Sequence, residues 1–430
     1  MVQPTSEPAS MDSSPPLHNP IVESEAKRPA RPSPARRLAL GAFSVLNRII
    51  PKVGKKVLVH SIPDLEDGVL SVLHEVIERG LRPVLLIGDP DTPYRFTELF
   101  GETSALFVRK ESRRALVHFM TVKYIFVTHG LFGNPKPPSS QCIVNLWHGE
   151  PPTKVIGRYE SQRGRQATVV PVLSKLGQAY RCTEFGLHPS QVPVLGAPRN
   201  DRLLRASRES VRKLIMGYGA NRPAFLWMPT FRATVPSRHQ RTDVARRFPG
   251  VPFGTEDIMR VDDWLDRNRA LIIVKAHPLD ADRLPSGLKA IRALSQADLE
   301  RHGLTVYTML AGFDGLITDV SSVWIDYLLL EKPIVFAFPD IEEYRASRGI
   351  NLEPYENWVP GPLVRTADQL TDCLGALLEG RDAFVEIRKQ ALRRMHRFYD
   401  DKSTQRLVDH VFGVHRPRRT DVAVEEPRKG

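Results

Sequence analysis

Short apolar runs alternate with segments of helical periodicity along most of the chain, and this alternation predicts the fold class. Strand-like runs at 55–61 and 82–89 flank the segment 65–76, whose apolar residues recur at spacings of three and four. The pattern continues through strand-like runs at 105–109, 124–130 and 143–149, with a helix expected at 112–123. Such alternation is typical of parallel sheets built from βαβ units.

A second series of the same kind begins after residue 223. Its strand-like runs are 224–230, 270–278, 304–307, 315–322 and 333–340, and helices are expected at 322–330 and 383–397. The polar stretch 233–262 predicts a long surface loop. We therefore expect an α/β protein with two Rossmann-like domains facing a cleft, at 55–205 and 206–412, followed by a charged tail at 413–430.

The N-terminal region differs from the rest. Residues 1–35 are rich in Pro, Ser and Ala without periodicity, which predicts a disordered extension. Residues 36–54 predict a basic amphipathic helix. Its apolar face consists of Leu38, Ala42, Val45, Leu46 and Ile49, fringed by Arg36, Arg37, Arg48 and Lys52. The pattern suits a helix at a membrane interface, and equally a helix that docks on the protein's own core.

Charge gathers in the same region. The chain has a formal net charge of +12, and residues 27–56 hold nine Lys or Arg and no acid. Such a cluster could meet anionic lipid or nucleic acid.

Composition limits the remaining classes. No stretch approaches the roughly 20 apolar residues that span a bilayer, and the run 38–46 lacks a cleavage site. Cys142, Cys182 and Cys373 form no disulfide or zinc pattern. We expect a cytoplasmic protein that is neither secreted nor membrane-spanning, with material for about two cores.

Polar residues just after apolar strands are the best candidates for chemistry, because ligands of open parallel sheets sit at the carboxyl ends of strands. His148 and Gly149 follow such a strand. An imidazole there can accept a proton near neutral pH, although a structural histidine is the alternative. Lys275 and His277 share one face of another strand, which suits a diphosphate.

Two further segments qualify. Ser321 and Ser322 open a helix directly after a strand, where backbone N–H groups and hydroxyls can hold an anion, or where a serine merely caps the helix. Asp326 lies one turn further on the same face. Thr230 and Arg232 follow a strand, and Arg199 stands where the first domain ends. The motifs GxGxxG, Walker A, GxSxG and HExxH are absent, which counts against dinucleotide oxidoreductases, P-loop kinases, common hydrolases and zinc peptidases.

In this order the segments resemble the CDP-glycerol glycerophosphotransferases of teichoic-acid synthesis. The matching motifs are WHGEPPTKVIG, LGAPRNDRL, MPTFRAT, KAHP, DVSSVWIDYLLLEKPIVF and DDKSTQRLVDHV. The resemblance covers about residues 55–412. It implies a glycosyltransferase B type fold that transfers glycerol phosphate from CDP-glycerol to an acceptor hydroxyl and releases CMP.

The resemblance also implies roles for individual residues. His148 would be the general base, and His277 would stabilise the diphosphate and the departing CMP. The remaining contacts to CDP-glycerol would come from Gly149, Glu150, Pro151, Pro152, Arg199, Thr230, Phe231, Arg232, Lys275, Ala276, Ser321, Ser322 and Asp326. Within this set the serines would hold phosphate, and Asp326 would contact glyceryl or ribose hydroxyls.

The implied acceptor is a lipid-linked glycan or polyol phosphate at the cytoplasmic face of the cell membrane. The chain would bind that anionic surface peripherally and would not bind nucleic acid. No metal ligand or cofactor is certain, and Mg²⁺ stays open.

Some positions depart from the family's pattern. Glu150 stands where Thr is usual, Pro152-Thr153 where Leu-Lys is usual, Lys275 for Arg and Ala233 for Asp. The donor motif is therefore better preserved than the acceptor motif, and the added carboxylate of Glu150 could change the choice of acceptor. Three alternatives remain: a nucleotide-sugar glycosyltransferase, a transferase that uses CDP-ribitol, and a non-catalytic protein that binds membranes or polyanions.

Overall fold

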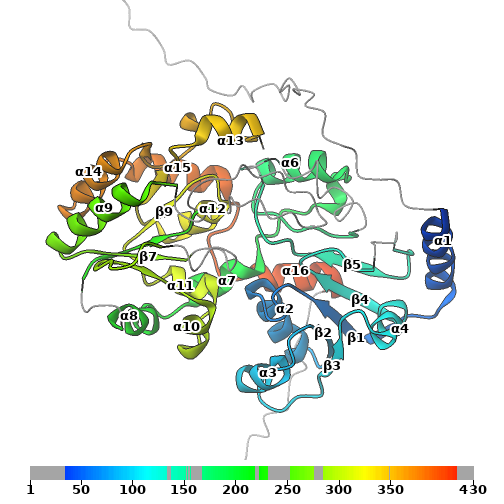
Figure 1. Ribbon diagram of the computed structural model, residues 1–430. Helices are drawn as coiled ribbons and strands as arrows, with labels where there is room; N and C mark the ends of the chain where they lie inside the picture. The colour runs from blue at the N-terminus through cyan, green and yellow to red at the C-terminus, as the bar shows by residue number, and fades with distance from the viewer. Residues whose placement is uncertain are drawn as a thin grey trace, which may run out of the picture.

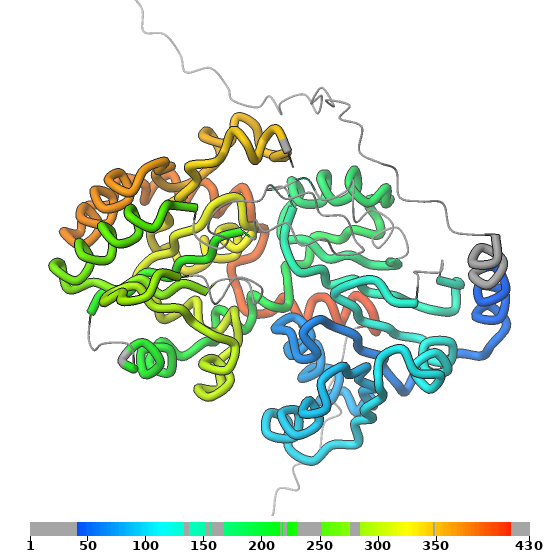
Figure 2. The backbone as a smooth tube through the Cα atoms, viewed as in Figure 1, coloured from blue at the N-terminus to red at the C-terminus, as the bar shows by residue number. Residues whose placement is uncertain are grey.

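The chain folds into two α/β units that stand side by side (Figures 1 and 2). The computed structural model describes residues 34–132, 137–151, 153, 155, 167–217, 222–230, 252–275, 284–347 and 349–413. The expected disordered extension and the charged tail lie almost entirely outside these residues.

The first unit is built on a five-stranded, wholly parallel sheet in the order β3-β2-β1-β4-β5. Its strands are β1 (Val53–His60), β2 (Arg82–Ile87), β3 (Leu106–Arg109), β4 (Val122–Val127) and β5 (Cys142–Asn145). The accompanying helices are α2 (Asp67–Glu78), α3 (Thr92–Phe100), α4 (Arg113–Thr121), α6 (Lys175–Phe185) and the short 3₁₀ turn η1 (Pro189–Gln191).

The second unit holds a six-stranded parallel sheet in the order β11-β10-β9-β6-β7-β8. Its strands are β6 (Ala224–Trp227), β7 (Leu271–Val274), β8 (Ile291–Ala293), β9 (Gly315–Thr318), β10 (Ile334–Ala337) and β11 (Leu363–Val364). The helices are α8 (Arg208–Met216), α9 (Thr255–Arg267), α10 (Gln296–Arg301), α11 (Val306–Leu310), α12 (Val323–Tyr327), η2 (Leu328–Leu330), α13 (Ile341–Ser347), η3 (Tyr355–Asn357), α14 (Ala367–Leu378) and α15 (Val385–Met395).

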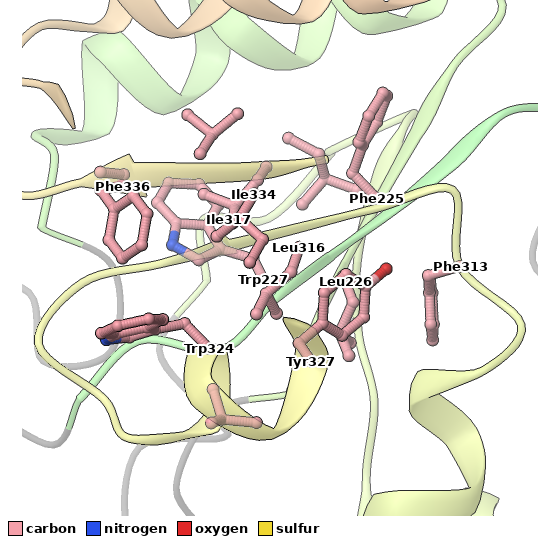
Figure 3. Packing of buried hydrophobic residues seen from close by; sticks show 14 of the residues in the cluster. Phe225, Leu226, Trp227, Phe313, Leu316, Ile317, Trp324, Tyr327, Ile334 and Phe336 are labelled. Atoms are coloured by element: carbon pink, nitrogen blue, oxygen red, sulfur yellow. The ribbon is translucent and has the colours of Figure 1, made fainter. Parts of the chain in front are cut away.

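The core of the second unit explains why its strands read as continuous apolar runs. Every residue of β6, β7, β9 and β10 is buried, as expected for a parallel sheet covered on both faces. Figure 3 shows Trp227 packed among these strands and Trp324, from α12, beside them; the Trp324 ring meets Phe336 of β10 edge-on at 5.9 Å between centroids. The predicted α/β class with two parallel sheets is confirmed.

Two local predictions were wrong. Residues 255–262, expected to be loop, form the first part of α9, whose Ile258, Val261 and Leu265 are buried at helical spacing. The run 304–307, expected to be a strand, instead contains the Thr305 cap and the start of α11. The strand β8 was missed because it has only three residues, and one of them is an arginine.

Two helices link the units. α7 (Pro198–Arg205) lies where the chain first crosses, and α16 (Ser403–Phe412) returns to pack against α2 and α7 (Figure 1). The Phe412 ring contacts Tyr124 of the first sheet at 4.3 Å. The α16 segment thus packs with the first unit, although the sequence division grouped it with the second. Its first turn is fixed by Asp201, which accepts hydrogen bonds from the backbone N–H of Ser403 at 2.9 Å and of Thr404 at 2.7 Å.

The helix α1 (Pro34–Ile49) lies on the outer side of the first unit, away from the second (Figure 1). It docks through Phe43, which stacks on Phe119 of α4 at 5.8 Å, and through the buried Asn47, which donates to Gln141 at 3.1 Å. The predicted apolar face is a different one, and its Val45 and Ile49 are 63% and 68% exposed. Docking on the core therefore leaves Val45, Leu46 and Ile49 uncovered. Among the described residues, no helix is both long and apolar enough to cross a membrane.

Candidate functional site

The carboxyl edge of the first sheet carries three histidines in a row. β1 and β4 are neighbours at the point where the strand order reverses, and β5 lies beside β4. His60 ends β1, His129 comes two residues after β4, and His148 comes three residues after β5. This reversal is the place where doubly wound sheets bind ligands.

His148 stands on a turn whose backbone is firmly held. The preceding Trp147 has a left-handed backbone with φ of 53°, an uncommon conformation for a bulky residue. The side-chain oxygen of Asn145 accepts the Trp147 N–H at 3.0 Å, and the buried Arg181 donates to the carbonyl of Gly149 at 2.9 Å. The Trp147 ring is buried against Phe185 at 4.9 Å. These contacts fix the turn and leave the His148 side chain exposed.

The imidazole of His148 contacts two other rings. It stacks on His129 at 4.7 Å between centroids with an interplanar angle of 6°, and on Trp147 at 4.5 Å. His60, deeper in the same edge, has its pKa lowered to about 4 by burial and, secondarily, by Lys110 and His129. His60 is therefore neutral at physiological pH.

Gly149 brings this turn against the second unit. A Cβ placed on Gly149 would lie 2.5 Å from the Ser322 hydroxyl oxygen at the start of α12. Only a residue without a side chain fits so close a contact unless the serine rotates. The expected cleft residues His148, Gly149 and Ser322 thus gather at one place, contributed by both sheets.

The carboxyl edge of the second sheet is organised by Asp319, which follows β9. Its carboxylate accepts hydrogen bonds from the Thr230 N–H at 2.9 Å, from the Thr230 hydroxyl at 2.5 Å and from the Ser321 N–H at 3.1 Å. β6 and β9 are the neighbours at which this sheet reverses its order. Thr230 is buried and holds the two strand ends together, so its hydroxyl points to Asp319 rather than outward.

The two serines do not cap the helix through their hydroxyls. Ser322 is the N-cap residue of α12 but makes no side-chain cap bond. Both serines are partly exposed, and Asp319 takes over the capping of the Ser321 N–H. Ser322 thus occupies the N-cap position that the alternative interpretation gave it, but its hydroxyl makes no capping hydrogen bond.

Arg199 and Asp326 bind each other instead of facing a ligand. Arg199 donates from Nε and Nη2 to the two carboxylate oxygens of Asp326 at 3.2 and 3.1 Å, and the Tyr307 hydroxyl donates to the same carboxylate at 2.9 Å. Arg199 is 3% exposed and Asp326 is 0% exposed. Asp326, predicted to contact polyol or ribose hydroxyls, therefore has both oxygens occupied. The pair joins α7 to α12 across the two units.

Glu150 is also turned inward. Its carboxylate accepts the Leu173 N–H at 2.9 Å and lies 4.0 Å from Arg199. Burial raises the pKa of Glu150 to about 7, although Arg199 works in the opposite direction. The prediction that this carboxylate contacts the substrate beside His148 is not supported, because the side chain is 5% exposed. The neighbouring Pro151 is buried as well.

Of the remaining predicted contacts, Lys275 lies within the described residues and the others do not. Lys275 follows β7 and is partly buried, and burial lowers the pKa of its ammonium. Five predicted site residues lie outside the described residues, namely Pro152, Phe231, Arg232, Ala276 and His277. Within the described ranges, no group of three or more His, Cys, Asp or Glu side chains could hold a metal ion.

Sequence reasoning missed three residues of this region. His60 and His129 follow apolar strands just as His148 does, so the criterion that selected His148 would also have found them. Tyr307 gave no such signal, because it lies inside α11 and reaches Asp326 only through the fold.

Comparison with known proteins agrees with this architecture. A family model described as CDP-glycerol:poly(glycerophosphate) glycerophosphotransferase matches residues 96–413, well over half of the chain. The resemblance seen in the sequence is thereby confirmed. The solved structure of the wall teichoic acid polymerase TagF superimposes with a TM-score of 0.69 at 18% identity, over 88% of this chain and 95% of that one. The fold is therefore of the glycosyltransferase B type.

Curated relatives belong to teichoic-acid synthesis. The teichoic acid ribitol-phosphate polymerase TarL of Staphylococcus aureus is 28% identical over 310 residues, which is 67% of this chain but only 51% of that protein. The teichoic acid ribitol-phosphate primase of Bacillus spizizenii is 27% identical over 398 residues, covering 86% of this chain and 94% of that one. This chain thus spans about half of the polymerase and nearly all of the primase.

Proposed function

Because the chain belongs to the CDP-glycerol:poly(glycerophosphate) glycerophosphotransferase family, we propose that it transfers a polyol phosphate from a CDP-polyol to an acceptor hydroxyl and releases CMP. Glycerol phosphate is the group that the donor motifs suggest. The acceptor is a membrane-associated glycan or polyol phosphate of a teichoic-acid-like polymer.

The observation that carries this proposal is the meeting of His148-Gly149 with Ser322. An exposed imidazole from the first sheet and a helix start from the second approach each other at Gly149. A group-transfer reaction needs such an arrangement, with a base on the acceptor side and hydrogen-bond donors on the donor phosphate.

The proposed chemistry is one displacement at phosphorus. His148 takes the proton of the acceptor hydroxyl while the oxygen of that hydroxyl bonds to the β-phosphorus of the donor. The bond from that phosphorus to the bridging oxygen breaks, and the electron pair leaves on CMP. Ser321 and Ser322 offer hydroxyls to the transferred phosphate, because neither is used in capping. In this reaction His277 would stabilise the departing CMP.

Acceptor-dependent release of CMP tests this proposal. The purified chain would be given CDP-glycerol and a lipid-linked disaccharide, and His148→Ala would be compared with His74→Ala, which removes an exposed histidine of α2. Loss of a general base should slow turnover by about 10²-fold or more, while the control keeps wild-type rates. Release of CDP from a nucleotide sugar would instead indicate a glycosyltransferase, and no turnover with any donor would indicate a binding protein.

CDP-ribitol is a second candidate donor. TarL and the Bacillus spizizenii primase, whose names specify ribitol phosphate, match this chain at 28% and 27% identity. Competition between CDP-glycerol and CDP-ribitol in one reaction decides between them through the ratio of the two kcat/KM values.

The exposed face of α1 suits peripheral binding to the anionic cytoplasmic surface of the membrane. Val45, Leu46 and Ile49 form this face, and Arg48 is exposed beside it. Lys52, predicted to fringe the face, instead donates to the backbone carbonyl of Asn47 at 2.5 Å and binds α4. Insertion of apolar side chains with a cationic fringe is the usual mode of interfacial helices.

Replacing Val45, Leu46 and Ile49 by serine should weaken sedimentation with phosphatidylglycerol vesicles and leave turnover on a soluble acceptor unchanged. Ile387→Ser, at an exposed apolar residue of α15, is the matched control. Equal vesicle binding by the triple variant and the wild type would refute the role of α1.

A further inference from the structure

The parallel contact between His129 and His148 joins two loops of the first sheet. The rings come from the segments after β4 and β5, and they lie 4.7 Å apart with planes only 6° from parallel. A neighbour so aligned restricts the rotation of an exposed imidazole, because any tilt would break the stack.

His129 is itself held in place. Its Nδ1 shares a hydrogen bond with the Thr128 hydroxyl at 2.9 Å. Thr128 is fully buried, its hydroxyl accepts the Ile62 N–H at 3.3 Å, and its own N–H donates to the carbonyl of His60 at 3.2 Å. The His129 ring is thus fixed relative to β1 and can serve as a rigid platform.

We propose that His129 is a positioning residue of the transfer reaction: its imidazole orients the His148 ring on which it stacks. This inference rests on the proposed role of His148. It assigns to His129 no contact with the substrate and no proton of its own in the reaction.

Two substitutions test this orienting role. His129→Ala removes the stacked ring, so kcat should fall by about tenfold while the KM for CDP-glycerol stays the same. His129→Phe keeps a flat ring that can stack on His148, so it should retain most of the wild-type kcat.

Controls make the outcomes distinct. Unfolding temperature and calorimetric binding of CDP-glycerol should match wild type in both variants, with His74→Ala as a surface control. Wild-type kcat in both variants would overturn the inference, as would a rise in acceptor KM with unchanged kcat, which would mean direct contact with the acceptor. If His148→Ala is inactive in the same assay, either of these two results overturns the role of His129 and leaves the proposed function intact. Full activity of His148→Ala would overturn the proposed base and this inference together.

Discussion

The buried pair of Arg199 and Asp326 allows a quantitative test of how the two units are held together. Arg199→Met keeps the apolar stem and removes the guanidinium, so the fully buried Asp326 retains only the Tyr307 hydroxyl. Breaking a buried ion pair on one side costs about 3–5 kcal/mol, because a charge is left without compensation. The variant should therefore lose a large share of the stability of an ordinary domain, about 5–15 kcal/mol.

The same helix offers a matched control. Arg205, also in α7, pairs with Asp401 at 2.7 Å, but its side chain is 58% exposed. Arg205→Met should cost no more than about 1 kcal/mol. Urea unfolding followed by tryptophan fluorescence measures both. The double variant with Arg199→Met and Asp326→Leu should recover part of the loss, because no unpaired charge remains. If Arg199→Met and Arg205→Met lowered the free energy of unfolding by similarly small amounts, the ion pair of Arg199 and Asp326 would not hold the two units together.

Three further outcomes follow from the contacts of Glu150, Gly149 and Asp201. Because burial raises the pKa of Glu150 from 4.5 to about 7, the folded chain keeps a proton that the unfolded chain releases, and stability falls as pH rises between these values. In urea titrations the free energy of unfolding of Glu150→Gln should therefore exceed that of wild type at pH 8 by at most about 3 kcal/mol, and the two should differ little at pH 4. A difference that stays the same at both pH values would contradict this reasoning. Gly149→Ala should push the Ser322 hydroxyl aside and raise the donor KM about tenfold at unchanged unfolding temperature, and unaltered kinetics would disprove the close approach. Asp201→Ala removes the acceptor that fixes the first turn of α16, so it should cost about 1–3 kcal/mol and speed hydrogen exchange in that helix, whereas wild-type protection would contradict its capping role.

The sequence predicted the sheets well because their strands are buried on both faces and so appear as uninterrupted apolar runs. The strand β6 is an example, with all four residues buried. The start of α9 was missed because its acidic residues make the segment appear polar, although Ile258, Val261 and Leu265 keep the helical spacing. Local pattern was thus sufficient for most elements but not for the amphipathic helix that follows a polar stretch.

The site was harder to predict because roles depend on partners far away in the chain. Asp326 has the spacing expected of a ligand contact after Ser322, yet Arg199, 127 residues earlier, takes its carboxylate. Glu150 lies two residues after His148 in the sequence, but its carboxylate contacts Leu173 and Arg199. Position after a strand predicted that His148 lies at the carboxyl edge of the first sheet, where its side chain is exposed, whereas the direction of a buried side chain could not be inferred from spacing.

In the proposed reaction, the acceptor attacks the β-phosphorus of a CDP-polyol between the two sheets. The most direct measurement uses CDP-glycerol carrying oxygen-18 at the oxygen that bridges the two phosphates, with mass spectrometry of both products. The label should leave entirely in CMP, and the acceptor should gain an unlabelled glycerol phosphate. Release of labelled CDP, with an acceptor that gains no phosphorus, would contradict this mechanism.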